Sequence, residues 1–193
     1  IVGSMKVTDR TAMALSGALY RKYRLRRVYY SPFHLPRSSH FDFFPEKNTP
    51  RWRTRRMYQA DRLMQLYGFG VDEILPEDAP NLPFDLDPKA AWALRHLDRF
   101  PVEVNTADYE TLIRVPGIGI TGAKRILQAR RLHTLTHELL RRIGVSLKRA
   151  QYFITCNGRY TGGRLLDSPA LRPAVSDVAS QTRLPGWEEA EAS

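Results

Sequence analysis

Apolar side chains recur at helical spacing in residues 105–114 and again in residues 120–131, and each stretch predicts a short amphipathic helix. Pro116 excludes the helical conformation at Val115, so the first helix ends there. A tight turn must then connect the two helices. The residues expected to face the core are Leu112, Ile113 and Val115 on the first side and Ala123, Ile126 and Leu127 on the second.

The predicted turn is rich in glycine. Gly117 and Gly119 flank Ile118, and we expect positive φ angles at both glycines and a close approach of the main chain to a ligand. Ile118 is expected to fill the angle between the helices. Asn105 offers a side-chain oxygen as the N-cap of the first helix, and Asp108 adds negative charge in its first turn.

The second helix is expected to begin at Ile120 or Thr121, so its unpaired amides and the positive end of its dipole form an anion site, for which phosphate is the obvious ligand. This layout resembles a helix-hairpin-helix, a module that grips the nucleic-acid backbone; the alternative is a plain turn between two helices. The full spacing from Leu112 to Ile126 is far more constrained than a lone glycine pair. The predicted DNA-binding residues here are Pro116, Gly117, Ile118, Gly119, Thr121, Gly122, Lys124 and Arg125.

A weaker copy of the pattern follows. Thr136 can cap a helix that Gly144 ends, and Ser146 can cap the next helix, with Lys148 and Arg149 in its first turn. This copy lacks the Pro-Gly start and has one glycine where the first has two, so it predicts a degenerate second hairpin. An ordinary helical pair is the alternative. Gly144, Ser146, Lys148 and Arg149 complete the predicted DNA-binding residues.

The N-terminal pattern predicts a strand, a helix and a second strand. Residues 1–4 and 27–31 are the strands, and Thr8 or Asp9 caps the helix. The expected buried face of this helix consists of Ala12, Leu15, Leu19 and Tyr23. Such a parallel crossover cannot cover its own two faces, so we expect the chain to be a fragment of a larger sheet protein. The alternative is that Gly3 and Ser4, before Met5, are a cloning scar.

Between these regions the pattern predicts a loop and linker helices. Residues 32–50 form a loop rich in proline and aromatics, which is a candidate lid, and residues 51–67 form a helix. This helix interleaves arginines with aromatics, which suits either phosphates and unstacked bases or a solvated basic face over a packed aromatic one. A further helix starts at Asp87-Pro88, and residues 159–193 show no periodicity and are expected to be disordered.

Composition favours a nucleic-acid binder. Lys and Arg total 30 against 20 Asp and Glu, for a net charge of +10 and a pI of about 10.0. An acidic membrane surface would attract the same charge, but no stretch reaches the apolar length of a transmembrane helix and no signal peptide is visible. The single cysteine, Cys156, excludes internal disulfides and a cysteine-rich metal site built from this chain alone, and it favours a reducing, cytoplasmic location.

Several blocks agree with one family, namely residues 1–3, 25–31, 58–61, 67–69, 85–88, 115–119 and 147–158. Together they resemble the C-terminal half of radical SAM proteins assigned to DNA modification or repair. The resemblance implies a partial α/β barrel with a 4Fe-4S cluster on three cysteines and S-adenosylmethionine, then a helix-hairpin-helix region, and an association with uracil-DNA-glycosylase-like proteins. It also implies that Gly3, Tyr30 and Ser31 lie near the cofactor, although Lys6 stands where the barrel strand of the family has a glutamate.

We therefore expect a mainly α protein with five parts: the end of a radical SAM barrel (1–31), an aromatic loop or lid (32–50), linker helices (51–98), a tandem helix-hairpin-helix DNA-binding region (99–158) and a disordered tail (159–193). The chain alone is expected to bind no cluster and to be inactive, because the three-cysteine motif is not in it. Two rivals stay open. One is a stand-alone DNA-binding module, and the other is a scaffold whose hairpins pack on a partner protein.

Overall fold

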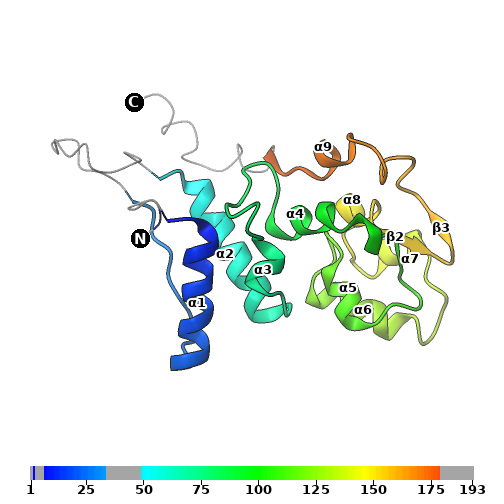
Figure 1. Ribbon diagram of the computed structural model, residues 1–193. Coiled ribbons are helices and arrows are strands. Elements are labelled where there is room, and N and C mark those ends of the chain that lie inside the picture. The colour runs from blue at the N-terminus through cyan, green and yellow to red at the C-terminus, as the bar shows by residue number, and fades with distance from the viewer. Residues whose placement is uncertain (1, 3–6, 34–48, 179–193) are drawn as a thin grey trace, which may run out of the picture. The chain divides into compact units, whose positions relative to one another are not determined.

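The computed structural model describes residues 2, 7–33 and 49–178 (Figure 1). It confirms a mainly helical chain, and the described residues form one small sheet. The helices are α1 (Asp9–Tyr23), α2 (Arg51–Leu66), α3 (Val71–Ile74), α4 (Pro88–Arg95), the 3-10 helix η1 (Leu97–Arg99), α5 (Tyr109–Arg114), α6 (Ile120–Ala129), α7 (His137–Arg142), α8 (Leu147–Ala150) and α9 (Leu171–Val175). The strands are β1 (Val102–Glu103), β2 (Ile154–Cys156) and β3 (Arg159–Tyr160). The chain divides into two compact units, unit 1 (residues 1–88 and 177–193) and unit 2 (residues 89–176).

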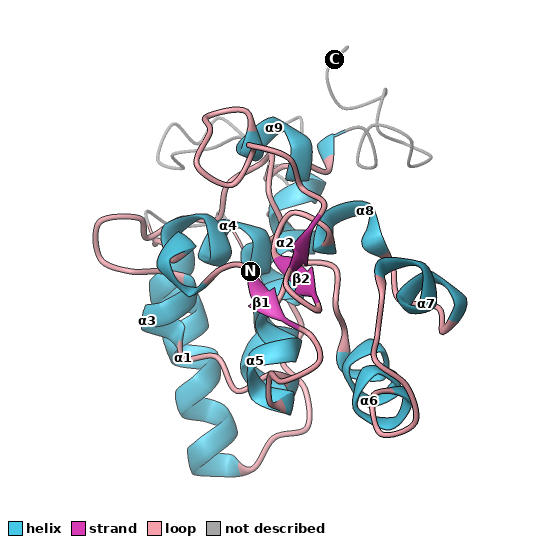
Figure 2. Ribbon diagram, turned by 90° about the vertical axis from the view of Figure 1, so that its right-hand side faces the viewer, coloured by secondary structure: helices cyan, strands magenta, loops and turns pink. Residues whose placement is uncertain are grey.

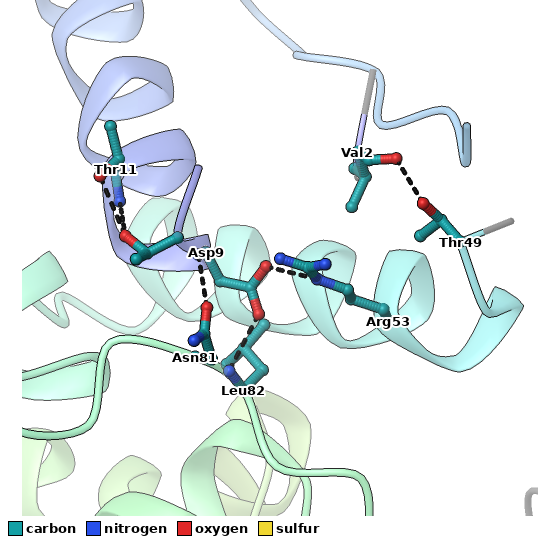
Figure 3. A network of polar contacts seen from close by, with 8 residues as sticks. Val2, Asp9, Thr11, Thr49, Arg53, Asn81 and Leu82 are labelled. Carbon is teal, nitrogen blue, oxygen red and sulfur yellow. Dashed lines mark hydrogen bonds and ion pairs between the residues drawn. The ribbon is translucent and has the colours of Figure 1, made fainter. Parts of the chain in front are cut away.

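Two neighbouring polar side chains fix the start of α1 in unit 1 (Figure 3). Thr8 is the N-cap, and its hydroxyl accepts a hydrogen bond from the Thr11 N–H (3.2 Å). The buried Asp9 carboxylate accepts one hydrogen bond from Arg53 Nε and another from the Leu82 N–H, each 2.9 Å long. Asp9 therefore ties α1 both to α2 and to the connector that precedes α4.

The buried face of α1 differs from the expected one. Leu15 and Tyr23, expected inside, are 61% and 58% exposed. The buried residues of α1 are Asp9, Met13, Ser16 and Gly17. A Cβ on Gly17 would lie 3.1 Å from the terminal methyl of Met64 in α2. Small residues thus let the two helices approach closely, and this requirement selects a face that hydrophobic spacing alone does not identify.

Arg56 in α2 is completely buried. Its guanidinium forms a bidentate ion pair with Asp177 and donates to the Phe84 carbonyl (2.7 Å). The sequence left two interpretations for the arginines of this helix, nucleic-acid contact or a solvated basic face, and neither describes Arg53 and Arg56, which are largely buried ion-pair partners. Their charges are neutralised by Asp9 and Asp177 within unit 1.

The strand expected at residues 27–31 does not form. Val2 is the only described residue of the strand expected at 1–4, and it makes a single parallel bridge to Pro32, in which the Val2 N–H donates to the Ser31 carbonyl (2.8 Å). The predicted parallel direction is present, but the described residues offer no further strand with which a ladder could extend. Residues 27–31 are held instead by two tyrosines of α1 and α2, because the Val28 N–H donates to the Tyr20 hydroxyl and the Tyr30 N–H to the Tyr58 hydroxyl, each at 3.0 Å.

The side chain of Tyr30 is buried in unit 1 and anchors this segment from its own side. Its hydroxyl lies 2.9 Å from Ser16 Oγ and 3.2 Å from Asp61 Oδ1, and the same carboxylate oxygen accepts a hydrogen bond from the Tyr20 hydroxyl (2.7 Å). Burial is the main cause that raises the pKa of Tyr20 to about 12, and it raises the pKa of Tyr30 as well. Both phenols are therefore neutral hydrogen-bonding groups, and a cofactor contact at Tyr30 stays a prediction.

The sheet of unit 2 has the order β1-β2-β3, with β1 parallel to β2 and β2 antiparallel to β3. Asn157 and Gly158 connect β2 and β3 with φ angles of 53° and 73°, as a two-residue type I′ turn requires. Figures 1 and 2 show α9 on the opposite side of unit 2 from α5 and α6. The helices α5 and α6 of the first hairpin thus lie on one side of the unit.

Residues 159–178 are ordered, which corrects the disorder expected from residue 159 onward. β3 pairs with β2, and α9 buries Leu171 and Val175. A helix of five residues is too short to produce a recognisable period in the sequence. The rest of the expected tail, residues 179–193, and most of the expected lid, residues 34–48, lie outside the described residues.

Arg56→Met should lower the free energy of unfolding by about 3–5 kcal/mol, because it leaves the Asp177 carboxylate buried without its cation. Arg10→Met is the matched control in the same unit, since it removes the same charge from a pair with Asp72, whose side chain is 82% exposed. That control should cost about 1 kcal/mol or less. Chemical denaturation followed by circular dichroism measures both, and equal losses would contradict the role given to Arg56.

Candidate nucleic-acid interface

Asp108, not Asn105, is the N-cap of α5. Its carboxylate accepts a hydrogen bond from the Thr111 N–H (2.7 Å), and hydrogen bonding to Thr111, with a smaller contribution from the charge of Arg130, lowers its pKa. The sequence offers two cap-type residues three positions apart, and the helix begins at the later one. Asn105 lies before the helix and binds Leu135 instead.

The turn between α5 and α6 has the predicted form, with one correction. Val115 is extended (φ −66°, ψ 125°), and Ile118 is only 1% exposed and fills the angle between the helices. Gly117 has a φ of +91°, as expected. Gly119 has a φ of −96° and is the N-cap of α6 in an extended conformation. Gly117 therefore has a backbone conformation that favours glycine, whereas Gly119 has one that any residue can adopt.

The N-terminus of α6 opens directly from this turn, and Figure 2 shows α6 next to α5. The first helical hydrogen bond joins the Ala123 N–H to the Gly119 carbonyl (2.8 Å). The amides of Ile120, Thr121 and Gly122 therefore precede the helical ladder and have no acceptor within the helix. Because α6 is 10 residues long, its dipole favours an anion at this end. These three amides form the centre of the candidate phosphate site.

The basic side chains of α6 differ in what they already contact. Lys124 is exposed one turn into the helix. Arg125 is also exposed, but it donates to the Ile143 carbonyl (3.1 Å). Arg130 donates to the Ala107 carbonyl (2.5 Å) and joins the end of α6 to the start of α5. Lys124 is therefore the side chain of α6 best placed for a phosphate, whereas Arg125 and Arg130 act as structural ties.

The second hairpin has the expected order but a shortened second helix. Thr136 caps α7 and accepts the Leu139 N–H (3.3 Å), and Gly144 has a φ of +79° in the turn. Ser146 holds the N-cap position of α8 without a capping hydrogen bond from its side chain. Since α8 has only four residues, its dipole adds little. The second hairpin therefore lacks a counterpart of the candidate phosphate site in the first.

The two hairpins pack turn against helix. A Cβ on Gly117 would lie 2.9 Å from the main-chain nitrogen of Ala150 in α8, so this position accepts only glycine. A Cβ on Gly122 in α6 would lie 3.9 Å from the Val145 side chain, in the turn of the second hairpin. Each turn thus rests on a helix of the other hairpin, and the second hairpin holds the first turn in place.

Burial divides the predicted DNA-binding residues into two groups. Those with full or partial exposure are Gly117, Gly119, Thr121, Gly122, Lys124, Arg125, Gly144, Ser146, Lys148 and Arg149. Pro116 and Ile118 are buried. The first group is accessible to a ligand, although Arg125 is already bound to the Ile143 carbonyl, whereas Pro116 and Ile118 can act only through the shape of the turn.

Asn105 connects the start of the first helical hairpin to the segment before α7, and Glu103 connects it to the turn between β2 and β3. Asn105 Oδ1 accepts the Leu135 N–H (2.7 Å), and its Nδ2 donates to the Leu135 carbonyl (3.2 Å). The Glu103 carboxylate accepts the N–H groups of Asn105, Asn157 and Gly158 at 2.8 to 3.0 Å. Burial raises the pKa of Glu103, but these hydrogen bonds outweigh it and lower the pKa to about 2. This contribution to stability is present above a pH of about 4.5 and is lost as the pH falls toward 2.

The described residues offer little for other kinds of chemistry. Burial raises the pKa of the Cys156 thiol to about 12, so it is not a nucleophile at neutral pH. In residues 2, 7–33 and 49–178, no group of three His, Cys, Asp or Glu side chains could hold a metal ion. No helix of these segments has the length and apolar character needed to cross a membrane. Gly3 lies outside the described residues, and a cofactor contact at the exposed Ser31 stays a prediction.

The short helices, the glycine turn and the amides at the start of α6 agree with the comparison to known families. Residues 99–138 match the helix-hairpin-helix motif. The match runs from the end of η1 through both hairpin helices to the start of α7. It supports a DNA-binding element that contacts the nucleic-acid backbone. Neither a curated protein nor a solved structure matches this chain.

Sequence reasoning missed Lys89, which lies in α4. Its Nζ donates to the Ile113 carbonyl (2.7 Å) and to the Ile118 carbonyl (2.6 Å), on the two sides of the first turn. The signal that could have indicated it is the surroundings of this lysine, because Ala90 and Trp92 follow it in an almost entirely buried helix. A lysine on such a helix needs a partner.

Gly117→Ala should lower the free energy of unfolding by about 1–3 kcal/mol, because the new Cβ meets both an unfavourable φ and the Ala150 main chain. Gly122→Ala is the matched control: its Cβ would make ordinary contacts of 3.6 and 3.9 Å, and alanine favours a helix. We expect this control to be neutral or stabilising. Thermal unfolding of both variants decides the point, and a Gly117→Ala protein as stable as the control would contradict the packing described here.

Proposed function

We propose that the chain binds the sugar-phosphate backbone of DNA through the first hairpin, with little dependence on base sequence. The observation that carries this proposal is the Gly117 turn, which leads directly into the unpaired amides of residues 120–122. Main-chain amides and the Lys124 ammonium are donors suited to phosphate oxygens, which carry no base identity. The match of residues 99–138 to the helix-hairpin-helix motif supports the same function.

Electrostatics favours the same ligand. The net charge of +10 attracts a polyanion, and the exposed Lys124 and Lys148 lie on the second helices of the two hairpins. Together with the α6 amides and the partly exposed Arg149, they offer about three to five phosphate contacts. The number is small because several other arginines of the chain are bound to carboxylates or carbonyls.

On duplex DNA, the logarithm of the affinity should fall with the logarithm of the salt concentration at a slope of about −3 to −4.5. Fluorescence anisotropy titrations at several potassium chloride concentrations measure the slope. Two unrelated DNA sequences should give similar affinities. A flat salt response would remove the electrostatic basis of the proposal.

Lys124→Met tests the hairpin within the same assay. It should reduce the slope by about 0.9 and weaken binding to both DNA sequences equally, because one phosphate contact is lost. Lys22→Met is the control, since it removes the same charge from the exposed surface of α1 in unit 1. If the two variants lose the same affinity, net charge rather than the hairpin accounts for binding.

We further propose, from the family resemblance, that this DNA-binding unit belongs to a cytoplasmic radical SAM protein that modifies or repairs DNA beside a uracil-DNA-glycosylase-like partner. The residues in hand do not fit the iron-sulfur cluster of that family. A cluster of this kind needs three cysteine thiolates, and the chain has one cysteine, which is buried and protonated. The cluster and the S-adenosylmethionine site would therefore be supplied by sequence outside this chain.

The reading frame upstream of Ile1 tests this second proposal. We expect a Cys-x-x-x-Cys-x-x-Cys motif there, and we expect the full-length product to bind iron and S-adenosylmethionine. Without that motif the enzyme hypothesis fails, and a stand-alone DNA-binding module becomes the better account. If the chain does not bind DNA either, the hairpins serve as a scaffold for a partner protein.

A further inference from the structure

A lysine side chain from α4 binds the turn of the first hairpin. Lys89, the second residue of α4, places its ammonium between two main-chain carbonyls, 2.7 Å from Ile113 O and 2.6 Å from Ile118 O. Ile113 is in the last turn of α5, where carbonyls have no helical donor, and Ile118 is in the turn itself. Two carbonyl dipoles therefore converge on one point, and the ammonium occupies it.

This point lies close to the candidate phosphate site. Ile118 O belongs to the peptide bond that ends at the Gly119 nitrogen, and standard peptide dimensions place the ammonium within about 5 Å of that nitrogen. Gly119 is the N-cap of α6, so the Lys89 ammonium lies at the peptide unit that leads into the amides of residues 120–122. The ammonium and the unpaired amides therefore contribute positive potential at the same turn, and a partly buried charge acts on an anion more strongly than a charge in bulk water does.

We propose that Lys89 is the resident cation of the hairpin turn and a positioning residue for the bound phosphate. It holds the carbonyls on both sides of the turn in one geometry, and it adds its charge to the amides that contact the phosphodiester. Lys89 lies outside the residues that match the motif, 99–138, so the site includes a residue that the motif does not contain. The inference rests on the proposed backbone binding.

Lys89→Met tests the charge, because methionine keeps an unbranched apolar stem and removes the ammonium. We expect roughly five- to twentyfold weaker binding to duplex DNA at low salt and a salt slope reduced by up to about 0.9. A merely structural lysine would weaken binding without changing the slope. Lys22→Met is again the charge-matched control, and thermal unfolding shows whether the variant is folded.

The second arm compares two salts, first with the wild-type protein and then with Lys89→Met. Wild-type protein should bind DNA equally well in potassium chloride and in tetramethylammonium chloride at the same ionic strength, since the ammonium already fills the carbonyl pair. Lys89→Met should bind more tightly in potassium chloride, because the small ion can enter the vacated carbonyls and the large one cannot. A potassium requirement in the wild type, or an unchanged slope in the variant, would overturn the proposal. Failure of the wild type and of Lys124→Met to show any salt-dependent binding would instead refute the proposed function.

Discussion

The close contact between Gly117 and the main chain of Ala150 is the constraint on which unit 2 depends. A Cβ at residue 117 would lie 2.9 Å from a backbone nitrogen, and main chain cannot move away as a side chain can. The contact brings the first turn onto α8, while Gly122 and Val145 bring the second turn near α6. The second hairpin, whose own helix is too short to attract an anion, thereby contributes by fixing the shape of the first.

The helices and strands of unit 2 are short, and this explains why so many of its polar side chains bind main-chain groups. Helices of four to ten residues leave a large share of their terminal amides and carbonyls without partners. Asn105, Glu103, Arg130 and Lys89 satisfy such groups at positions far from their own in the sequence. Individual side-chain hydrogen bonds thus satisfy main-chain groups that longer helices and strands would pair with one another. The same interactions determine which backbone amides, those of α6, are left for a ligand.

The sequence predicts the local elements well where the chemistry is local. Thr8, Thr136, Val115 and Ile118 behave as expected, because capping and the exclusion of helix before proline depend on neighbours in the chain. It fails where distant segments decide the outcome. The buried face of α1 depends on the approach of α2, and the partners of Arg56 and Lys89 are up to 121 residues away. For the site, the turn could be predicted, but not that Arg125 and Arg130 serve as ties.

Not every basic residue of the chain is available to a polyanion, because some of them stabilise the fold. Composition alone suggests that any of the 30 basic residues could meet a polyanion, and the arginines of α2 look suitable. Arg53 and Arg56 are instead paired with carboxylates, and Arg130 with main-chain carbonyls, so their charges support the fold. The effect of the exposed cations near the hairpin therefore depends on their placement beside the α6 amides as well as on their number. Binding through such a site should be local to the few phosphate groups that reach the α6 amides and the lysines beside them, which suits a unit that holds DNA without selecting its sequence.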